Sequence, residues 1–553
     1  MVRGVSKKWW MVVAAGLLVV AGGCGDDGAA VVSVDLFGWH NGSFLDSIAD
    51  YPDAQELEIR VTRPDEGVEV TQDTFSIADG GAQLPELDGG EGLRMDFELR
   101  DNTGEVIAFG ATPVFETGKE AAYNEFRTLV SATDEFAPVG ARFADGDGVQ
   151  WYGQSRFDGV SLQGSLGRVG HAAHPTRSGD ILVVGGARLS GSYEVGEKPD
   201  IEHAFNDIQI LESGTGHFTE LAGEYGVEDG PVGEDRLQVG RAFHTVTPLG
   251  DDRFLVAGGF DADGQAISAL ELIDLNAEEG NRVQSLNASL SQARGMHTAT
   301  LRTSDDRVVI AGGLGATSDE VRSTIEVVDV DADSVQSGIG MATSRVGHAA
   351  VLLEDGSSVW LIGGRDSGAI LDSTELVTAD GASATSASSH TMDRRRLGAA
   401  AVHLGAAANN RVVIIGGFVS SSGVTASYEI GNPLLIGEII NGSSFGHTWE
   451  VDHARGASTA VQLPHSRDLV LLGGQDNNGT PVAQGERFHV DLDEITGPLI
   501  SIDGEVGSMF ERRSGYASSL VSNGRIVIIG GADLSGTELD TAEYFTPYDP
   551  VGR

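Results

Sequence analysis

The sequence predicts an all-β protein in which a seven-bladed β-propeller follows a small β-sandwich. Three observations support this prediction. Glycine accounts for 77 of 553 residues and aromatic residues for only 6 %, a mix typical of chains with many turns and few long helices. An apolar run that ends in two glycines recurs seven times in the larger, C-terminal part of the chain. Ahead of these repeats, short segments alternate apolar and polar residues as half-buried strands do.

The chain begins with a predicted signal peptide, residues 1–23. Basic residues precede an apolar run from Trp9 to Ala21, which is short for a membrane-spanning helix and is soon followed by acidic residues. The run leads into "AGGC", which resembles the lipobox of bacterial lipoproteins. That resemblance implies that Cys24 carries the lipid and becomes the first mature residue. The alternative is an ordinary cleaved signal followed by a cysteine without a role.

The lipobox resemblance also predicts where the protein resides. Gly25, and not aspartate, follows the cysteine, which in the Gram-negative family points to the outer membrane. We therefore expect a lipid-anchored envelope protein whose membrane partner is reached through Cys24, with residues 24–30 as a tether. The sequence does not indicate whether it faces the periplasm or the cell surface.

Residues 31–140 predict the β-sandwich, which could be immunoglobulin-like. Segments such as "ELEIRVTR" and "LRMDFELRD" alternate apolar and polar side chains, and turn residues separate them. This period of two differs from the pattern that follows.

Residues 145–553 predict the propeller. The seven diglycines end at positions spaced by 73, 54, 51, 53, 57 and 57 residues: Gly186, Gly259, Gly313, Gly364, Gly417, Gly474 and Gly531. An arginine-containing segment precedes each copy, and strand-like segments follow most of them. A period near 50 residues with four short strands per unit is typical of propeller blades.

This pattern resembles kelch and galactose-oxidase-type propellers. The resemblance implies a binding or scaffolding domain, or an enzyme that acts at the propeller mouth. Galactose oxidase chemistry also needs copper and a Tyr–Cys cross-link, whereas the only cysteine here is assigned to the lipid. We therefore expect no cofactor.

The last repeat ends after its third strand, so another part of the chain must complete that blade. "RFDGVSLQGSLGRVGH" resembles the stretch that holds a fourth strand elsewhere. We predict that Phe157–Leu162 supplies the missing outer strand and removes the open edge of the ring.

An arginine opens the innermost strand of every unit, and this is the candidate binding face. The seven residues are Arg168, Arg241, Arg294, Arg345, Arg396, Arg455 and Arg513. A ring of cations at one mouth could bind an anion or an acidic partner. The alternative, which perfect repetition favours, is that each arginine pairs with a carboxylate and braces its blade; the proposed carboxylates are Glu271, Glu326, Glu375, Glu429 and Glu543.

Four histidines lie three residues after an arginine: His171, His244, His297 and His348. Three steps along a strand point to the opposite side, and each histidine belongs to a different blade. Packing between blades is therefore preferred over a metal site, and no metal ligands are predicted.

Four further motifs resemble catalytic or metal-binding sequences but lack a feature that such sites require. "GSSFG" at Gly442–Gly446, followed by His447, matches a hydrolase elbow, but it lacks the strand-to-helix turn that the elbow requires. "DGDG" at Asp145, "DADG" at Asp261 and "DNNG" at Asp476 resemble calcium loops in composition. They lack the bidentate glutamate, so tight turns are preferred and weak calcium binding is the alternative.

The longest gap between repeats holds an insertion, Ala187–Phe205. It leaves the second strand of the first blade on the arginine side, where a long loop could cover the mouth and bind a partner. A tolerated surface insertion is the preferred interpretation.

Composition and charge limit the function. The chain has 82 acidic and 36 basic residues, a net charge of −46, which excludes nucleic acids as partners. We expect a monomer that binds or scaffolds a protein or glycan at the envelope, with no catalytic residues. A glycan-acting hydrolase, lyase or epimerase is the alternative.

Overall fold

In the computed structural model, the chain forms two compact units. The first unit contains residues 1–133, 140–153 and 213–216, and the second contains residues 134–139, 154–212 and 217–553. The structure describes residues 18–22, 31–40, 43–45, 48–63, 68–77, 90–112, 115–117, 124–139, 141–145, 148–152, 167–191, 194–211, 218–221, 235–380, 383–404, 411–420, 423–424, 427–431, 449–450, 452–463, 468–489, 500–521 and 524–547.

The first unit contains one nine-stranded sheet. Its main path runs β1 (Leu18–Gly22), β2 (Val31–His40), β9 (Asn124–Ala132), β7 (Val106–Ala111), β6 (Gly90–Arg100), β4 (Glu56–Arg63) and β5 (Val68–Ser76). Two short strands, β3 (Ser43–Leu45) and β8 (Phe115–Thr117), pair with β2 and β6, and η1 (Ile48–Asp50) follows β3. The hairpin of β11 (Ala141–Asp145) and β12 (Gly148–Tyr152) forms a separate sheet.

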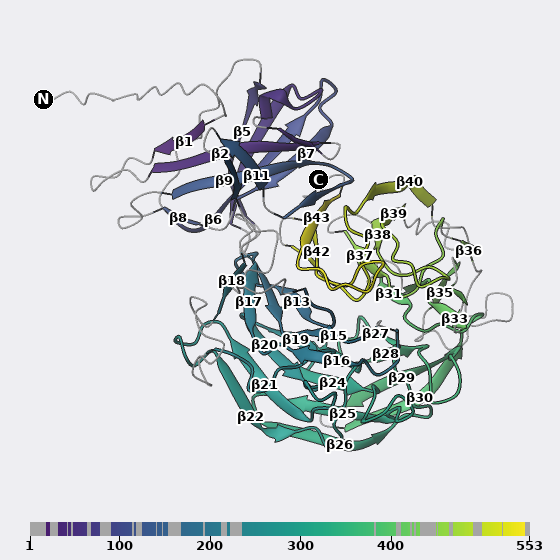
Figure 1. The fold of residues 1–553 in the computed structure, drawn as a ribbon. Helices are drawn as coiled ribbons and strands as arrows, with labels where there is room; N and C mark the ends of the chain where they lie inside the picture. The colour runs from purple at the N-terminus through teal and green to yellow at the C-terminus, as the bar shows by residue number, and fades with distance from the viewer. Residues whose placement is uncertain are drawn as a thin grey trace, which may run out of the picture. The chain divides into compact units, whose positions relative to one another are not determined.

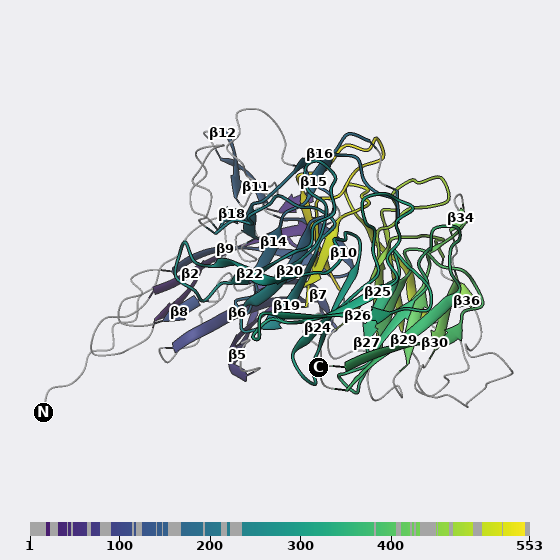
Figure 2. The ribbon, with the colours of Figure 1, turned by 90° about the horizontal axis from the view of Figure 1, so that it is seen from below.

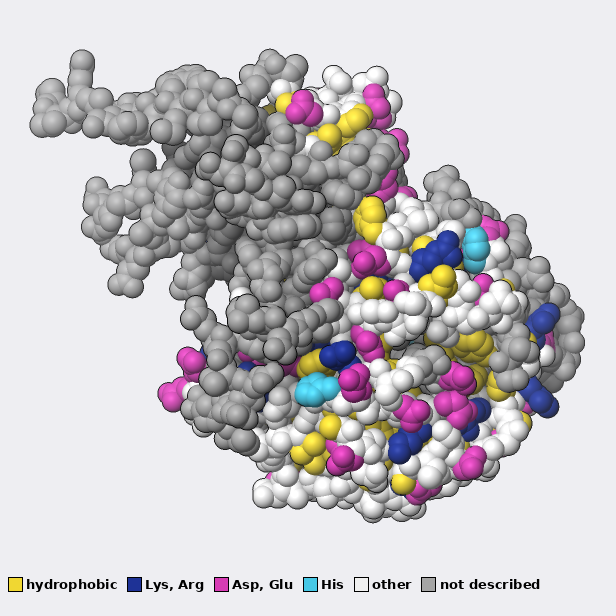
Figure 3. Space-filling model, viewed as in Figure 1, with side chains coloured by type: hydrophobic (Ala, Val, Ile, Leu, Met, Phe, Trp, Pro, Cys, Tyr) yellow, Lys and Arg dark blue, Asp and Glu magenta, His cyan; other side chains and the backbone are white. Residues whose placement is uncertain are grey.

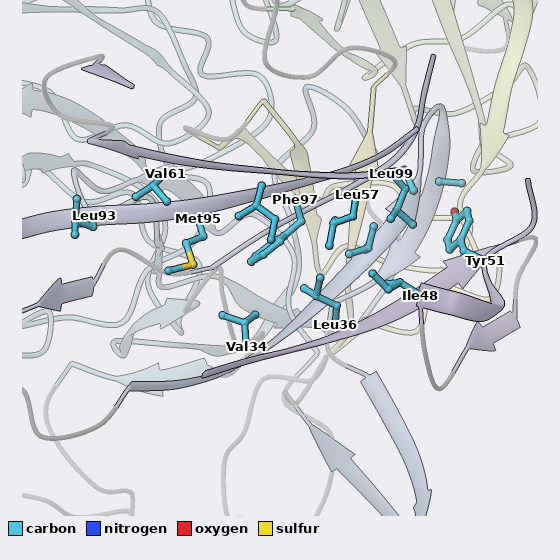
Figure 4. Packing of buried hydrophobic residues seen from close by; sticks show 14 residues of the cluster. Val34, Leu36, Ile48, Tyr51, Leu57, Val61, Leu93, Met95, Phe97 and Leu99 are labelled. Atoms are coloured by element: carbon cyan, nitrogen blue, oxygen red, sulfur yellow. The ribbon is translucent and has the colours of Figure 1, made fainter. Parts of the chain in front are cut away.

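The predicted alternation builds the core of this unit. Leu57, Ile59 and Val61 of β4 are completely buried in one cluster with alternate residues of β6. Val34 and Leu36 of β2 complete the cluster from the other side (Figure 4). The layered core expected of a sandwich is thus formed by distant strands of a single sheet. The sheet is not purely antiparallel, because β2 and β9 run parallel.

The second unit is the predicted seven-bladed, kelch-like propeller (Figure 1). From the inside outward, blades 1 to 3 are β13 (Ala172–Pro175), β14 (Ile181–Val184), β17 (Ile208–Leu211), β18 (Phe218–Glu220); β19 (Thr245–Gly250), β20 (Arg253–Ala257), β21 (Ala269–Asp274), β22 (Val283–Ser289); and β23 (Thr298–Arg302), β24 (Arg307–Ala311), β25 (Thr324–Asp329), β26 (Ser334–Gly340). Blades 4 and 5 are β27 (Ala349–Leu352), β28 (Val359–Ile362), β29 (Ser373–Asp380), β30 (Ser383–Thr391); and β31 (Ala400–His403), β32 (Val412–Ile415), β35 (Ser427–Gly431), β36 (Trp449–Glu450). Blades 6 and 7 are β37 (Thr459–Gln462), β38 (Asp468–Leu472), β39 (Gln484–His489), β40 (Ile500–Ser508); and β41 (Ala517–Leu520), β42 (Ile526–Ile529), β43 (Ala542–Thr546), β10 (Glu135–Pro138).

The apolar runs before the diglycines form the second strand of each blade. Runs such as "VVII" in β32 and "IVII" in β42 are completely buried, because a neighbouring blade covers each face of the strand. Apolar clusters fill all seven spaces between adjacent blades, including the space between blades 7 and 1. The ring is therefore closed by packing all the way around.

The strand that closes the ring differs from the predicted one. Blade 7 receives its outer strand from β10, which pairs with β43 in antiparallel register from Glu135–Thr546 to Pro138–Glu543. The predicted closing segment, Phe157–Leu162, lies outside the described residues. The propeller thus begins at Asp134 and not at residue 145, and β10 lies in the range that the sequence assigned to the sandwich.

Buried contacts hold β10 in place. Phe136 is 2 % exposed, and its ring centroid lies 5.0 Å from that of Phe545 on β43. The carboxylate of Asp134 accepts bonds of 3.1 and 3.2 Å from Nη1 of Arg487, which links the closing strand to blade 6. This residue pattern, "EFAP", is too short to signal a propeller strand in the sequence.

Candidate binding site at the mouth of the propeller

The seven repeated arginines are buried. Each has a relative exposure of 0 %, including Arg168 of blade 1 and Arg513 of blade 7. Each lies four residues before the first strand of its blade, at the end of the ring where the diglycines also lie. We call this end the Arg-side mouth.

The guanidinium groups brace their own blades. Nη1 of Arg294 donates to the carbonyls of Gly312 and Thr324 (both 3.0 Å), and Nη2 donates to Glu326 at 2.7 Å. Glu326 also accepts backbone N–H groups from Ser291 and Gln292. One buried ion pair therefore joins three segments of the same blade: the entry to the first strand, the end of the second and the third strand.

The same brace recurs in blade after blade. The ion pairs are Arg168–Asp207, Arg241–Glu271, Arg294–Glu326, Arg345–Glu375, Arg455–Glu486 and Arg513–Glu543. Arg396 donates to the carbonyl of Gly416, and the side chain of Glu429 lies outside the described part of the chain.

This geometry corrects the interpretation of the arginine ring as a binding face. The residues concerned are Arg168, Arg241, Arg294, Arg345, Arg396, Arg455 and Arg513. A ligand in solution cannot reach a guanidinium that is fully buried and already bonded to carbonyls and carboxylates. Burial disfavours the charged form of both partners of such a pair. It lowers the pKa of Arg241 and raises that of Glu271, and the attraction between the two charges opposes both shifts.

Blade 1 uses a different acid from the other blades. At the position of the usual glutamate, opposite Val183, stands Gln209, which donates to Asp207 at 2.7 Å. Asp207 lies two residues earlier, and its carboxylate accepts two hydrogen bonds from Arg168, of 2.9 and 3.0 Å. Sequence reasoning missed Asp207 because it falls outside the repeat. It also missed Glu486, although "QGERF" is similar to the other third strands.

The diglycines are required by contacts between blades. Both glycines of each pair have φ between 56° and 104°. A Cβ on Gly312 would lie 2.2 Å from the carbonyl oxygen of Arg345 in the next blade, and the N–H of Gly313 donates to that oxygen at 2.9 Å. Any side chain here would push adjacent blades apart, which explains why two strand-weakening residues end each strong strand.

The four histidines pack between blades, as the sequence predicts. A Cβ on Gly258 would lie 2.8 Å from Cε1 of His297, and Nε2 of His297 lies 2.9 Å from Oγ1 of Thr245 in the preceding blade. His348 and Thr298 repeat the pair at 2.9 Å. Burial and the nearby arginine lower the pKa of His171 and of His297 to about 3, so both rings are neutral. Tyr516 takes the place of the histidine in blade 7 and donates to the carbonyl of Leu472.

Metal binding gains no support from the described residues, where no group of three or more His, Cys, Asp or Glu side chains could hold an ion. Oδ1 of Asp261 accepts the N–H groups of Asp263 and Gln265, and Oδ1 of Asp476 accepts those of Asn478 and Thr480. Asp145 pairs with Gly148 in the β11–β12 hairpin. The sequences at Asp261 and Asp476 thus form tight turns.

A ring of left-handed residues surrounds the Arg-side mouth. The residue two positions after each arginine has φ between 53° and 65°: Gly170, Phe243, Met296, Gly347, Gly398, Ala457 and Gly515. Several of them donate their N–H to the equivalent carbonyl of the preceding blade, as Phe243 does to Gly170 at 2.7 Å. Two of the three non-glycine members, Phe243 and Met296, place large apolar side chains at the mouth, and they pack on the buried cluster of Phe260, Leu314 and Val346.

The insertion of blade 1 reaches this mouth. It is a two-stranded ribbon of β15 (Ala187–Leu189) and β16 (Ile201–Ala204), extended by a bond from Ser190 N–H to the carbonyl of Asp200. The ribbon lies over the middle of the ring in Figure 1 and at its upper side in Figure 2. Its tip contacts blades 3, 4 and 5, so the insertion lies on the arginine side, as the sequence predicts, and extends over the mouth.

Arg365 is a cation at the mouth that sequence reasoning missed. It directly follows the diglycine of blade 4, where blades 2, 3 and 5 carry Phe260, Leu314 and Phe418. Its side chain is 12 % exposed and binds the tip of the insertion. A charged residue at a position that is otherwise mainly apolar is the signal that could have found it. In Figure 3, acidic side chains clearly outnumber basic ones on this described face of the propeller.

Two other predicted features lie outside the described residues: Cys24, and the segment Gly442–Gly446 with His447. In the part of the chain that is described, no helix combines the length and the apolar character needed to cross a membrane.

Comparison with known proteins gives only structural similarity. No protein-family profile matches the chain, and no curated protein matches it. Among solved structures, that of YjhT is similar with 13 % identity and a TM-score of 0.41, covering 62 % of this chain and 100 % of the other. A novel fungal alcohol oxidase with catalytic diversity among the AA5 family, in complex with copper, is similar with 15 % identity and a TM-score of 0.49, covering 72 % and 79 %.

Proposed function

We propose that this chain is an outer-membrane lipoprotein whose propeller binds or scaffolds a protein or glycan partner at its Arg-side mouth. The observation that carries the proposal is the composition of that mouth. Phe243 and Met296 lie partly exposed there, and Arg365, whose side chain is 12 % exposed, lies at the same mouth, while the repeated arginines and their acids are used as braces. Partly exposed apolar side chains and a guanidinium at one mouth are suited to recognition by packing and hydrogen bonds.

Site-specific cross-linking tests the binding face. A photo-reactive amino acid replaces Ser367, which is exposed in the loop after Arg365, and in a matched variant it replaces Gln284 on the exposed outer strand of blade 2. After illumination of envelope preparations, we expect a discrete cross-linked product from position 367 and none from position 284. Equal products from both positions would contradict a site at the mouth.

A glycan partner requires a second measurement, because the cross-linker captures mainly proteins. The intact protein is applied to a glycan array and then incubated with any glycan that it retains. Binding without change of the glycan supports the proposal. Cleavage or epimerisation of the glycan supports the alternative, a glycan-acting enzyme.

The anchoring part of the proposal depends on Cys24, the only cysteine in the chain. We expect the Cys24→Ser variant either to be absent from the membrane fraction or to retain its signal peptide. In both cases a lipid precursor should no longer label the protein. Unchanged fractionation with the signal removed would contradict lipidation. Strand β1 lies within the predicted signal peptide, so lipidation also implies that the mature sheet ends at β2.

A further inference from the structure

The tip of the blade 1 insertion is a turn. The N–H of Glu197 donates to the carbonyl of Glu194 at 3.1 Å, and Gly196 between them has φ +81°. Glycine at this position of a tight turn is what a type II turn requires. The turn presents a valine side chain, a backbone carbonyl and a carboxylate to the mouth of the ring.

Arg365 recognises two of these groups. Its Nε and Nη2 donate to the carbonyl of Gly196 at 3.1 and 2.7 Å, and Nη2 lies 3.0 Å from the carboxylate of Glu197. Nη2 also donates to the carbonyl of Ser318 in blade 3 at 3.0 Å, which fixes the guanidinium in place. The hydroxyl of Ser318 in turn accepts the N–H of Lys198 at 2.9 Å.

Val195 fills a hollow between the left-handed residues of blades 4 and 5. Its Cγ1 lies 3.0 Å from the position that a Cβ on Gly398 would take and 3.8 Å from that of Gly347. Leu397 closes the side of the hollow, 3.2 Å from the corresponding position on Gly196. Blades 2 and 3 have no such hollow, because Phe243 and Met296 occupy the equivalent positions.

These contacts are those of a ligand in a binding site, except that the ligand belongs to the same chain. The apolar hollow, the fixed guanidinium and the Ser318 hydroxyl come from blades 3, 4 and 5, and the occupant comes from blade 1. Val195 is only partly buried and the side chain of Glu197 is 45 % exposed, and partly exposed ion pairs add little affinity. Such an occupant can be exchanged.

We propose that the Arg-side mouth is a peptide-binding site that is filled in the resting protein by residues 194–199. The partner would supply a peptide turn. In that turn, a small apolar residue, a glycine and a residue with a carboxylate follow one another in the sequence. This inference rests on the proposed binding function and names its ligand class and its built-in competitor.

The test removes the competitor without disturbing the ribbon. Residues 191–199 are replaced by Asn-Gly, which joins Ser190 to Asp200 by the two-residue turn that antiparallel strands favour. Binding of a fluorescent peptide with the sequence of residues 194–200, EVGEKPD, is then measured by polarisation. We expect the trimmed protein to bind this peptide at least about tenfold more tightly than the intact protein, because a tethered tip competes at an effective concentration in the millimolar range.

Matched variants test the chemistry of recognition. In the trimmed protein, Arg365→Gln should weaken peptide binding at least about tenfold, since the fork of two bonds is lost. Arg322→Gln is the control, because Arg322 is a partly buried arginine of blade 3 that binds Glu320 and the carbonyl of Ala293 instead of the tip. A peptide with aspartate in place of Val195 should not bind.

A second variant covers the case in which the trimmed protein does not fold. In the full-length chain, Glu197→Arg places a cation against Arg365 and should release the tip, so that the peptide binds more tightly than it does to the unaltered protein. The inference is overturned if a folded variant of either kind fails to bind the peptide at about 1 mM, the effective concentration of the tip.

The outcomes also separate this inference from the proposed function. Cross-linking from Ser367 that persists in a protein unable to bind the peptide would leave the proposed function standing and overturn the peptide site. Peptide binding without any captured partner would support the peptide site and contradict the broader proposal.

Discussion

At the scale of single residues, the repeated arginine holds each blade together through bonds within that blade. In blade 3, Arg294 bonds to the carbonyl that ends one strand, to the carbonyl that begins the next and to Glu326. Removing one partner of a buried pair leaves the other charge without compensation, which costs about 3–5 kcal/mol.

We therefore predict that Arg294→Gln lowers the free energy of unfolding by about 3–5 kcal/mol. The control is Arg307→Gln, which removes the partly exposed pair with Asp329 and should cost at most about 1 kcal/mol. Chemical denaturation of the two variants measures the difference. Similar small losses in both would show that the buried ion pair is not a brace.

A second residue-scale feature is the histidine of blade 2. His297 and His348 each lie against a threonine hydroxyl of the preceding blade, at the position after that blade's own histidine. The equivalent residue for His244 is Ala172, and both ring nitrogens of His244 lack a hydrogen-bond partner. The threonine–histidine pair is thus incomplete at His244.

We predict that Ala172→Thr completes this pair and stabilises the protein by about 1 kcal/mol. The matched reverse change, Thr298→Ala, removes the partner of His348 and should destabilise by about 1–3 kcal/mol. Melting temperatures at pH 8 compare the two. Loss of stability in both variants would contradict the pairing and indicate that blade 1 has no room for the larger side chain.

At the scale of elements, the closing strand decides whether the ring is complete. Phe136 of β10 packs against Phe545 and a cluster between blades 6 and 7 that includes Leu472 and Ile528. Its side chain reaches this core from a strand that precedes the rest of the propeller by about thirty residues of sequence, since β13 begins at Ala172.

We predict that Phe136→Ala destabilises the propeller by about 3–5 kcal/mol, the usual cost of removing a buried phenylalanine side chain. The comparison is Phe157→Ala, in the segment that the sequence suggested for closure. The melting temperature of the propeller, measured for each variant, distinguishes the two. A larger loss from Phe157→Ala than from Phe136→Ala would mean that β10 is not the closing strand.

At the scale of the whole molecule, buried neutral histidines make stability depend on pH. The pKa values of His171 and His297 are lowered to about 3 and that of His174 to about 4, mainly by burial, while an unfolded histidine titrates near its ordinary value of 6.5. A lowered pKa means that the stabilisation is complete above pH 6.5 and is lost as the pH falls toward 3, because only the unfolded chain takes up the protons.

We predict that the free energy of unfolding falls as the pH is lowered from 7 to 5, by up to about 2 kcal/mol for each such histidine. His297→Gln removes one of these groups, so its deficit relative to the unaltered protein should shrink over this range. Denaturation at pH 7, 6 and 5 gives the comparison. A deficit that stays constant with pH would show that His297 does not cause the acid sensitivity.

The sequence by itself determined the repeated features. Seven apolar runs with diglycines specify the seven blades. Each repeated residue contacts other repeated residues, so its role can be read from the spacing of the repeats. The pairing of Arg294 with Glu326, the placement of His297 between blades and the position of Ala187–Phe205 on the arginine side all followed from spacing and strand direction.

Tertiary structure decided the features that occur once. The choice of β10 as closing strand depends on where the chain returns after the first unit, and four residues carry too little pattern to show it. The pairing of Arg168 with Asp207 departs from the repeat, and the contact of Arg365 with Gly196 joins residues 169 positions apart. Repetition reveals contacts that every blade makes, whereas contacts across the mouth depend on the ring being closed in three dimensions.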